Sequence, residues 1–399
     1  MTIKAVGALG ATFVLAGWIS GVLGGDGGRS VNPANPADRA SPETSSRPFL
    51  PISVGTGAPE TGESGARGQL EEGILLVALK QAGRLMVVDA VSGDVRRSVD
   101  LRGPGAEVGR SVGPHEVAVS RDGRTAVVSL YGAKDPGHEL VFVSLPEGRI
   151  SGRLGLDGYS RPHGLVFLGE GEAERLLVTA EVQQSLLVID PMSHAVESAI
   201  ETKQWGSHMV AALDADRAYV SNVASASVSV LNIASGELEA IISTGNGAEG
   251  IAVRPGGGEV WVANNQANNV SVIDGTTLSV TRYVACPNVP IRVVFTPDGS
   301  KALVTSAGTG ELVVFDAGSY EELGRVDLLS EEHYDGTHPQ LGSSPVPVGV
   351  VPSASGRLAY VSNMAGGYVS VVDLESLEVL RVFDLGDDAG PDGIAFVAG

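Results

Sequence analysis

Short runs of alternating hydrophobic and polar residues, separated by tight polar turns, fill the chain from about residue 70 to its end. Such alternation is typical of β-strands with one face in a core and the other toward solvent or a neighbouring sheet. The turns contain segments such as RDGR, PDGS and ASGR, whose Asp-Gly and Ser-Gly pairs favour sharp reversals of the chain. The pattern predicts an all-β protein built from many short strands.

The strands recur in units of four. The clearest copies are AYVSNVASASVSVLNIASGELEAIIST from Ala218, VWVANNQANNVSVIDGTTLSVTRYV from Val260 and AYVSNMAGGYVSVVDLESLEVLRVF from Ala359. A further strand precedes each unit, as in HEVAVSRDGR and HMVAALDADR. Successive units begin at intervals mostly in the forties, which is typical of the four-stranded blades of a β-propeller. Weaker copies begin at Ile74, Ala126, Leu176 and Ala302.

The two ends of the repeat region complement each other. The last segment, PDGIAFVAG from Pro391, matches an innermost strand and then stops. The first repeat, from about Glu71, has the outer strands of a blade and lacks the innermost one. We therefore expect both ends to combine in one blade, which gives a seven-bladed β-propeller without a free sheet edge at the junction.

The motifs YVSN and WVAN, each followed by VSVLN, VSVID or VSVVD, resemble those of the YVTN-repeat family of β-propellers. The resemblance covers residues 70–399, which we take as the propeller domain. It implies the fold and not one particular activity, because propellers carry many functions. What it implies about function is a non-catalytic propeller that binds a ligand.

Residues 1–69 differ from the repeats. Lys4 precedes an uncharged stretch from Ala5 to Leu23 that small residues follow, the arrangement of an export leader. We interpret residues 1–24 as a signal peptide or, since the stretch is long enough to cross a bilayer, a signal anchor. Residues 25–69 are rich in Gly, Pro, Ser and Thr, which predicts a disordered linker. We expect an exported protein that is periplasmic, extracellular or held at the membrane only by an uncleaved leader.

Charge and cysteine content narrow the classes of partner. The formal net charge is −20, which repels the phosphates of nucleic acids and favours cationic ligands. The single cysteine, Cys286, excludes an intramolecular disulfide, and covalent c-type haem is excluded by the absence of a Cys-x-x-Cys-His motif. We interpret Cys286 as a small buried residue, with a thiolate metal ligand as the alternative. The composition therefore points to a metal ion or a small molecule rather than nucleic acid.

The start of each innermost strand is expected at one end of the central channel, which we call the top face. The residues at that position form a first ring: His115, His163, His208, Glu249, Ile291, Val348 and Asp392. The following residues form a second ring: Glu116, Gly164, Met209, Gly250, Arg292, Gly349 and Gly393. Three consecutive blades thus place histidine at an equivalent position.

Further polar residues are expected on the top face. His138 lies in a loop of the second blade, and the one long insertion between blades, LLSEEHYDGTHPQLGSSPVP, carries two more histidines. Six of the seven histidines therefore fall on this face, and an insertion of that length is often a binding loop or lid. The candidate ligand-binding residues are Arg292, Trp205, Glu181, His138, His333 and His338.

Metal binding is the chemistry that this pattern favours. Neutral imidazole is the commonest protein ligand of copper, iron and zinc, so His115, His163 and His208 are the candidate metal ligands. Three imidazoles that leave one position open form the geometry of a catalytic metal site. The candidate proton-transfer groups, catalytic if the protein is an enzyme, are Glu116, Glu249 and Asp392.

Two interpretations of the histidines and two functions remain open at this point. The histidines could instead be polar channel lining, duplicated with the repeat, and Arg292 could be a salt-bridge partner. The first function is a propeller that binds a metal ion or other ligand at the top of the channel. The second is a copper or iron oxidoreductase, or a metal-assisted lyase, that uses the same site. Convergence of the three imidazoles in space would favour a metal site.

Overall fold

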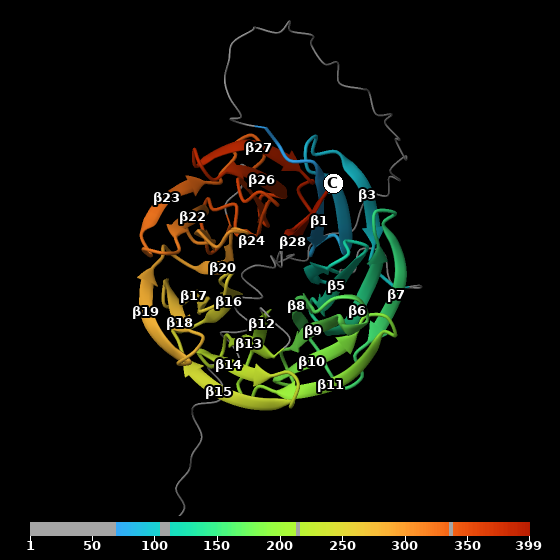
Figure 1. Cartoon of the computed structure of the whole chain (residues 1–399). Helices are drawn as coiled ribbons and strands as arrows, with labels where there is room; N and C mark the ends of the chain where they lie inside the picture. The colour runs from blue at the N-terminus through green and yellow to red at the C-terminus, as the bar shows by residue number, and fades with distance from the viewer. Residues whose placement is uncertain (1–68, 104–111, 213–215, 335–337) are drawn as a thin grey trace, which may run out of the picture.

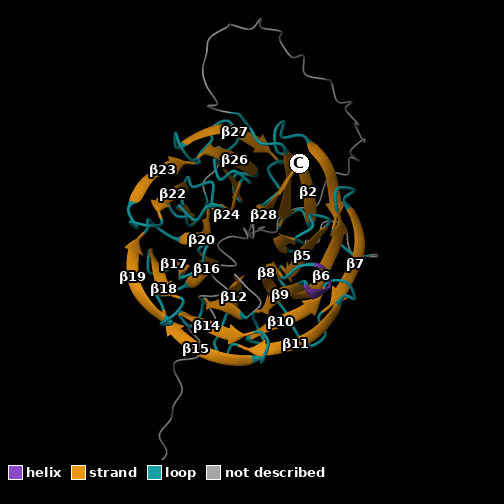
Figure 2. Ribbon diagram, viewed as in Figure 1, coloured by secondary structure: helices purple, strands orange, loops and turns teal. Residues whose placement is uncertain are grey.

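Seven four-stranded antiparallel sheets form a ring around a central channel in the computed structural model (Figure 1). The structure describes residues 69–103, 112–212, 216–334 and 338–399, so the proposed leader and nearly all of the proposed linker lie outside the described residues. Within those ranges the helical content is one 3-10 turn, η1 (Gly171–Ala173), seen beside the strands in Figure 2. No helix there is long and apolar enough to span a bilayer. The predicted seven-bladed propeller is confirmed.

Each blade runs from an innermost strand at the channel to an outermost strand at the rim. The innermost strands are β4 (Pro114–Val119), β8 (Pro162–Leu168), β12 (Ser207–Ala212), β16 (Ala248–Val253), β20 (Pro290–Phe295), β24 (Pro347–Pro352) and β28 (Pro391–Ala398). The second strands are β5 (Thr125–Gly132), β9 (Arg175–Ala180), β13 (Arg217–Asn222), β17 (Glu259–Asn264), β21 (Lys301–Ser306), β25 (Leu358–Asn363) and β1 (Gly73–Leu79).

The outer half of each blade consists of a third and a fourth strand. The third strands are β6 (Pro136–Ser144), β10 (Ser185–Asp190), β14 (Ser227–Asn232), β18 (Asn269–Asp274), β22 (Glu311–Asp316), β26 (Tyr368–Asp373) and β2 (Arg84–Asp89). The outermost strands are β7 (Arg149–Gly155), β11 (Ala195–Glu201), β15 (Glu237–Ser243), β19 (Ser279–Ala285), β23 (Glu322–Asp327), β27 (Glu378–Asp384) and β3 (Val95–Asp100).

The core lies between the blades. The second and third strands are buried on both faces, because each blade packs against a neighbour on either side, and their sequences are therefore nearly continuous runs of apolar residues. Outermost strands such as β15 are largely exposed and carry polar residues. Cys286 lies in one of these interblade layers beside Trp261, and burial raises the pKa of its thiol to about 12. It is a buried core residue, as interpreted.

The ring closes in the blade that contains both ends of the repeat region (Figure 1). β28, the last strand, pairs antiparallel with β1, and Gly73 lies opposite Ala398. Phe396 of β28 stacks on Tyr360 of the neighbouring blade, with ring centroids 5.3 Å apart. The orphan final strand and the incomplete first repeat therefore complete each other, as the sequence predicted.

A β-bulge at the start of the innermost strands decides which side chains reach the top of the channel. In β4 the pairing register shifts between Pro114 and Val117, and the other six blades shift at the equivalent place. Two residues before each first-ring position, φ is positive, from 55° at Arg161 to 74° at Gly206. Because a bulge adds one residue and redirects side chains, first-ring and second-ring residues can both contribute to the top of the channel.

A hydroxyl from the second strand supports the bulge in most blades. Ser221, the serine of one YVSN motif, accepts a hydrogen bond from the backbone N–H of Met209 at 3.1 Å. The same hydroxyl donates to the carbonyl oxygen of Glu249 in the next blade, at 2.6 Å. The motif serine is therefore structural, because it satisfies an N–H that the bulge leaves unpaired and joins neighbouring blades. The residues that do the same elsewhere are Ser129, Thr179, Thr305 and Ser362.

Candidate functional site

Three histidines from neighbouring blades lie against one another at the top of the channel, with their rings tilted by 48° and 35°. The ring centroids of His115 and His163 are 4.0 Å apart, and those of His163 and His208 are 3.5 Å apart. We call these residues the histidine stack. All three are buried, and His163 in the middle has no exposed surface. Identical bulges on consecutive blades bring equivalent side chains together here, so the sequence pattern of three aligned histidines becomes a contact in space.

One end of the histidine stack lies against two charged residues of the closing blade, Lys80 and Asp392. Lys80, the residue after β1, places its Nζ 3.0 Å from His115 Nε2 and 3.2 Å from Asp392 Oδ2. Asp392 Oδ2 is also 3.1 Å from His115 Nδ1. Burial, together with the nearby charges of Lys80 and Arg292, holds the pKa of His115 well below its usual range. The His115 ring is therefore neutral.

The other end of the stack lies between two carboxylates. His208 Nε2 is 2.8 Å from Glu249 Oε1, and its Nδ1 is 3.5 Å from Glu181 Oε2. Burial alone would lower the pKa of His208, but the two carboxylates outweigh it and raise that pKa to about 9. Burial likewise opposes ionisation of Glu249, whereas His208 and Arg292 lower its pKa. His208 and Glu249 thus form a buried ion pair, in which His208 is protonated at neutral pH.

Arg292 connects the two ends of the site. Its guanidinium forms an ion pair with Glu116 and lies 3.3 Å from Glu249 Oε1. Arg292 is 5% exposed, and these carboxylates raise the pKa of its guanidinium above the ordinary value even though burial opposes this. Burial, with a contribution from Asp392, raises the pKa of Glu116 despite its contact with Arg292. Arg292 is therefore the salt-bridge partner that the sequence left as one alternative.

His163 is the unusual member of the stack. Both of its ring nitrogens are buried without a hydrogen-bond partner among the described residues. Burial and its two neighbouring histidines hold its pKa well below the usual range, so its ring is neutral. Ligand atoms of His115, Glu116 and His163 all lie within 4.8 Å of one another. These three residues could hold a metal ion between them.

The sequence did not identify Lys80 or Tyr131 as site residues. The Tyr131 ring meets His115 and His163 edge-on, with centroids 5.1 and 5.3 Å away, and its hydroxyl donates to Glu181 Oε2 at 2.8 Å. Asn265 Nδ2 donates to Glu249 Oε2 at 3.0 Å. A signal was present, because equivalent positions at the end of the second strands form a third ring, which directly follows the strand in six blades and lies within β5 in the other. Its members are Lys80, Tyr131, Glu181, Val223, Asn265, Ala307 and Met364. Glu181 was the one member that we identified from the sequence.

The remaining candidate residues lie away from the stack or at its margin. Trp205 is 49% exposed in the loop before β12, and His138 is exposed at the start of β6. In the insertion, His333 Nδ1 is 2.8 Å from Ser330 Oγ, and its ring lies against Tyr368. His338 makes backbone hydrogen bonds to Gly342 in the same loop. Among the described residues, His333 and His338 thus contact residues outside the histidine stack.

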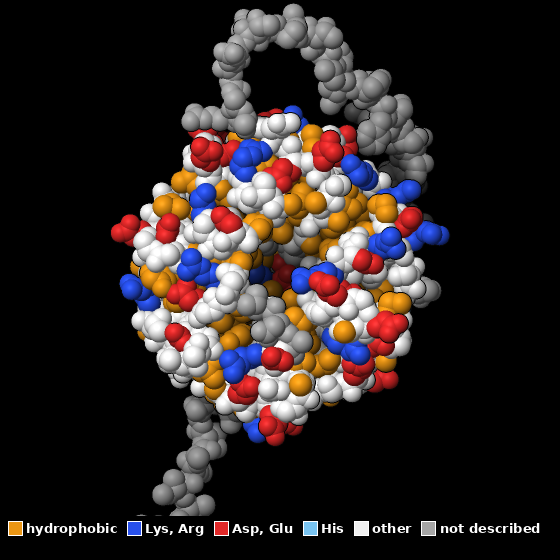
Figure 3. Space-filling view, in the orientation of Figure 1, with side chains coloured by type: hydrophobic (Ala, Val, Ile, Leu, Met, Phe, Trp, Pro, Cys, Tyr) orange, Lys and Arg blue, Asp and Glu red, His pale blue; other side chains and the backbone are white. Residues whose placement is uncertain are grey.

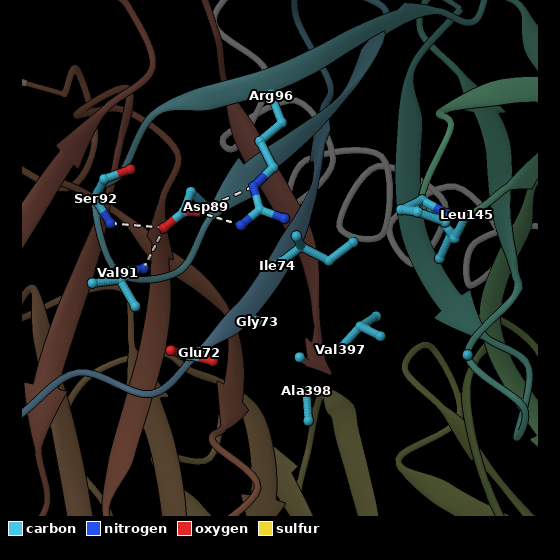
Figure 4. A pocket seen from close by; sticks show the side chains of 13 residues that line it. Glu72, Gly73, Ile74, Asp89, Val91, Ser92, Arg96, Leu145, Val397 and Ala398 are labelled. Carbon is cyan, nitrogen blue, oxygen red and sulfur yellow. Dashed lines mark hydrogen bonds and ion pairs between the residues drawn. The ribbon is translucent and has the colours of Figure 1, made fainter.

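The space-filling view shows a hollow at the centre of the ring, with acidic and basic side chains at its mouth (Figure 3). A separate cavity of about 570 Å³ lies at the opposite end of the strands from the histidine stack, between the closing blade and the next (Figure 4). Its wall includes Ile74, Leu145 and Val397, with the ion pair of Asp89 and Arg96 at one side. It contains none of the candidate site residues.

Comparison with known proteins supports the β-propeller fold. Residues 158–336 match the model of the YNCE-like beta-propeller family. With the seven-bladed structure, this match confirms the predicted resemblance to YVTN-type propellers. No curated protein sequence matches the chain. The protein is therefore a seven-bladed β-propeller, and residues 158–336 are similar to the YNCE-like beta-propeller family.

Two solved structures illustrate how far the similarity extends. A functionally unknown protein from Desulfotomaculum acetoxidans is 15% identical, with a TM-score of 0.65, and the match covers 82% of this chain and 99% of the other. The hydrazine synthase of Kuenenia stuttgartiensis is 17% identical, with a TM-score of 0.59 and coverage of 75% and 99%. At this level of identity the similarity extends to the fold alone.

Proposed function

We propose that this propeller binds a divalent transition-metal ion at the top of its channel through His115, His163 and Glu116. The observation that carries the proposal is His163, which is fully buried while neither ring nitrogen has a partner among the described residues. Burying an unpartnered polar group costs about 1–3 kcal/mol. A metal ion held between His163, His115 and Glu116 would give that group a partner.

The donor set suits the proposed ion. Two neutral imidazoles and one carboxylate are suitable ligands for copper, zinc or iron. The low pKa values of His115 and His163 favour the neutral form of both rings, which is the form that binds metals. His208 was the third ligand expected from the sequence. Because it is paired with Glu249 and protonated, we assign the third position to Glu116 instead.

Metal content and affinity test the proposal. We expect His163→Leu to lose the bound ion while the fold is kept, because the equivalent residues of two other blades, Ile291 and Val348, are also apolar. The control is His194→Leu, since His194 stacks on Phe142 at the opposite face. Elemental analysis and Zn²⁺ titration should distinguish the two variants. Equal metal binding by wild type and His163→Leu, or none by the wild type, would refute the proposal.

Catalysis at the same site is a second candidate function. It is favoured by Glu116, because burial raises the pKa of a carboxyl group that belongs to the proposed metal site and could carry a proton. For an oxidoreductase, the copper-loaded protein should transfer two electrons and one proton from the ascorbate anion to dioxygen, with a second proton from solvent, giving dehydroascorbate and hydrogen peroxide. Oxygen consumption by wild type that does not exceed that of His163→Leu would contradict this role.

We further propose that the protein works outside the cytoplasm. The uncharged stretch after Lys4 and the small residues that follow it support export. Residues 1–69 fused to an alkaline phosphatase that folds only in an oxidising compartment should give an active reporter. An inactive reporter with normal expression would contradict export.

A further inference from the structure

Lys80 occupies a special position relative to the proposed metal site. It follows β1 in the closing blade and places its ammonium group against His115, one of the three proposed ligands. The distances from Lys80 Nζ are 3.0 Å to His115 Nε2 and 3.2 Å to Asp392 Oδ2. In the third ring Lys80 is the only cationic residue, so the ammonium group that contacts His115 is a feature of this one blade.

Whichever ring nitrogen of His115 binds a metal, the hydrogen bond from Lys80 is lost. An ammonium group only donates, so Nε2 must accept with its lone pair, and the neutral ring then carries its proton on Nδ1. A metal at Nε2 would occupy that lone pair. A metal at Nδ1 would require the ring proton to be on Nε2. Two donors, this N–H and the ammonium group of Lys80, would then face each other at the present separation of 3.0 Å.

We propose that Lys80 is a built-in competitor of the metal ion at His115, so that the ion enters only when the ammonium group is displaced. This inference rests on the metal-binding function proposed above. Asp392, which belongs to the same blade, keeps a carboxylate beside the displaced ammonium group. Lys80 also repels any cation that approaches His115. The site therefore binds free metal ions more weakly than its ligands alone would, and it discriminates against weakly binding cations.

Substitution of Lys80 tests the inference in the full-length protein. We expect Lys80→Met, which keeps most of the length of the side chain and removes its charge, to bind Zn²⁺ at least about tenfold more tightly than wild type. Lys80→Arg, which keeps the charge and donors, should not gain affinity. Lys301→Met is the matched control, because Lys301 begins β21 at the opposite end of the strands. Competition with a chromogenic chelator gives the affinities of all four proteins.

The outcomes separate this inference from the function on which it rests. If Lys80→Met binds Zn²⁺ no more tightly than wild type while His163→Leu abolishes binding, the competitor role is overturned and the metal site stands. If neither the wild type nor any variant binds metal, both proposals fail.

The ring proton of His115 provides an independent measurement on metal-free protein. Long-range ¹H–¹⁵N spectra of histidine-labelled protein should show the Nδ1–H tautomer of His115 in wild type, because Lys80 faces Nε2 and the Asp392 carboxylate faces Nδ1. An Nε2–H tautomer in wild type would overturn the inference without any metal titration.

Discussion

The first ring of the channel consists of two arcs with the same backbone and opposite chemistry. The polar arc runs through five consecutive blades and comprises Asp392, His115, His163, His208 and Glu249. The apolar arc comprises Ile291 and Val348 in the two remaining blades. Both arcs have a positive φ two residues earlier and a bulge at the start of the strand. The repeat therefore determines the backbone conformation, whereas the residue type at the first-ring position differs from blade to blade.

The side chains of the two arcs contribute differently to stability. Ile291 and Val348 pack with Ala307, Val346 and Met364 in one apolar cluster, where burial itself is favourable. The polar arc buries rings and carboxylates, and several of its polar atoms lack a hydrogen-bond partner among the described residues. Buried polar groups without partners cost free energy, so stability alone would favour an apolar residue at these positions. The proposed site lies in the polar arc, where five blades keep the costly residue.

The largest effect is expected at Arg292, the residue through which the two arcs meet. It follows Ile291 in β20, yet it pairs with Glu116 and Glu249 on the polar side. Arg292→Met leaves Glu116 buried without the cation that it pairs with and leaves Glu249 with the cation of His208, so the free energy of unfolding should fall by about 3–5 kcal/mol in urea denaturation. Arg325→Met is the control, because its ion pair with Glu322 is exposed and should contribute about 1 kcal/mol or less. If both variants lost the same free energy of unfolding, the buried ion pairs of Arg292 would contribute no more to stability than an exposed one.

The next effect is a pH dependence that belongs to the polar arc alone. The pKa of His208 is about 9 in the folded protein and 6.5 as an ordinary value, because Glu249 and Glu181 outweigh burial. Its stabilising contribution is therefore fully present below pH 6.5 and is lost as the pH rises through about 9. The loss is on the order of 3 kcal/mol, measured as the free energy of unfolding in urea from below pH 6.5 to above pH 9. His208→Gln should remove most of this slope, and an unchanged slope would contradict the assignment.

The smallest effect should be equal in the two arcs, since it concerns the backbone that they share. Ser221 supports the bulge in the blade of His208, in the polar arc, and donates to the carbonyl of Glu249 at 2.6 Å. Thr305 does the same in the blade of Ile291, where it donates to the carbonyl of Val348 at 2.9 Å. Ser221→Ala and Thr305→Val should each lower the free energy of unfolding by about 1–2 kcal/mol. Thermal and urea unfolding of the two variants give the comparison. If only one of the two substitutions lowered the free energy of unfolding, the bulges of the two arcs would not be equivalent.

The sequence by itself determined the ring and its register. Strand alternation, the four-strand repeat and the turn residues are local features, and they suffice to predict the blades and the closure of β28 on β1. Because the repeats align, the same reasoning placed His115, His163 and His208 at equivalent positions. It also interpreted Cys286 correctly as a buried residue.

Only the tertiary structure decided how the aligned side chains interact. Protonation, pairing and stacking depend on distances of a few ångströms between different blades, and no repeat pattern contains those distances. The sequence treated the three histidines as equal candidate ligands, whereas the structure pairs His208 with Glu249 and leaves the nitrogens of His163 without partners among the described residues. Lys80 reaches His115 across the boundary between neighbouring blades, and it reaches Asp392 because the last strand, β28, pairs with β1. The position of each residue follows from its repeat, and its chemistry follows from its neighbours in the adjoining blades.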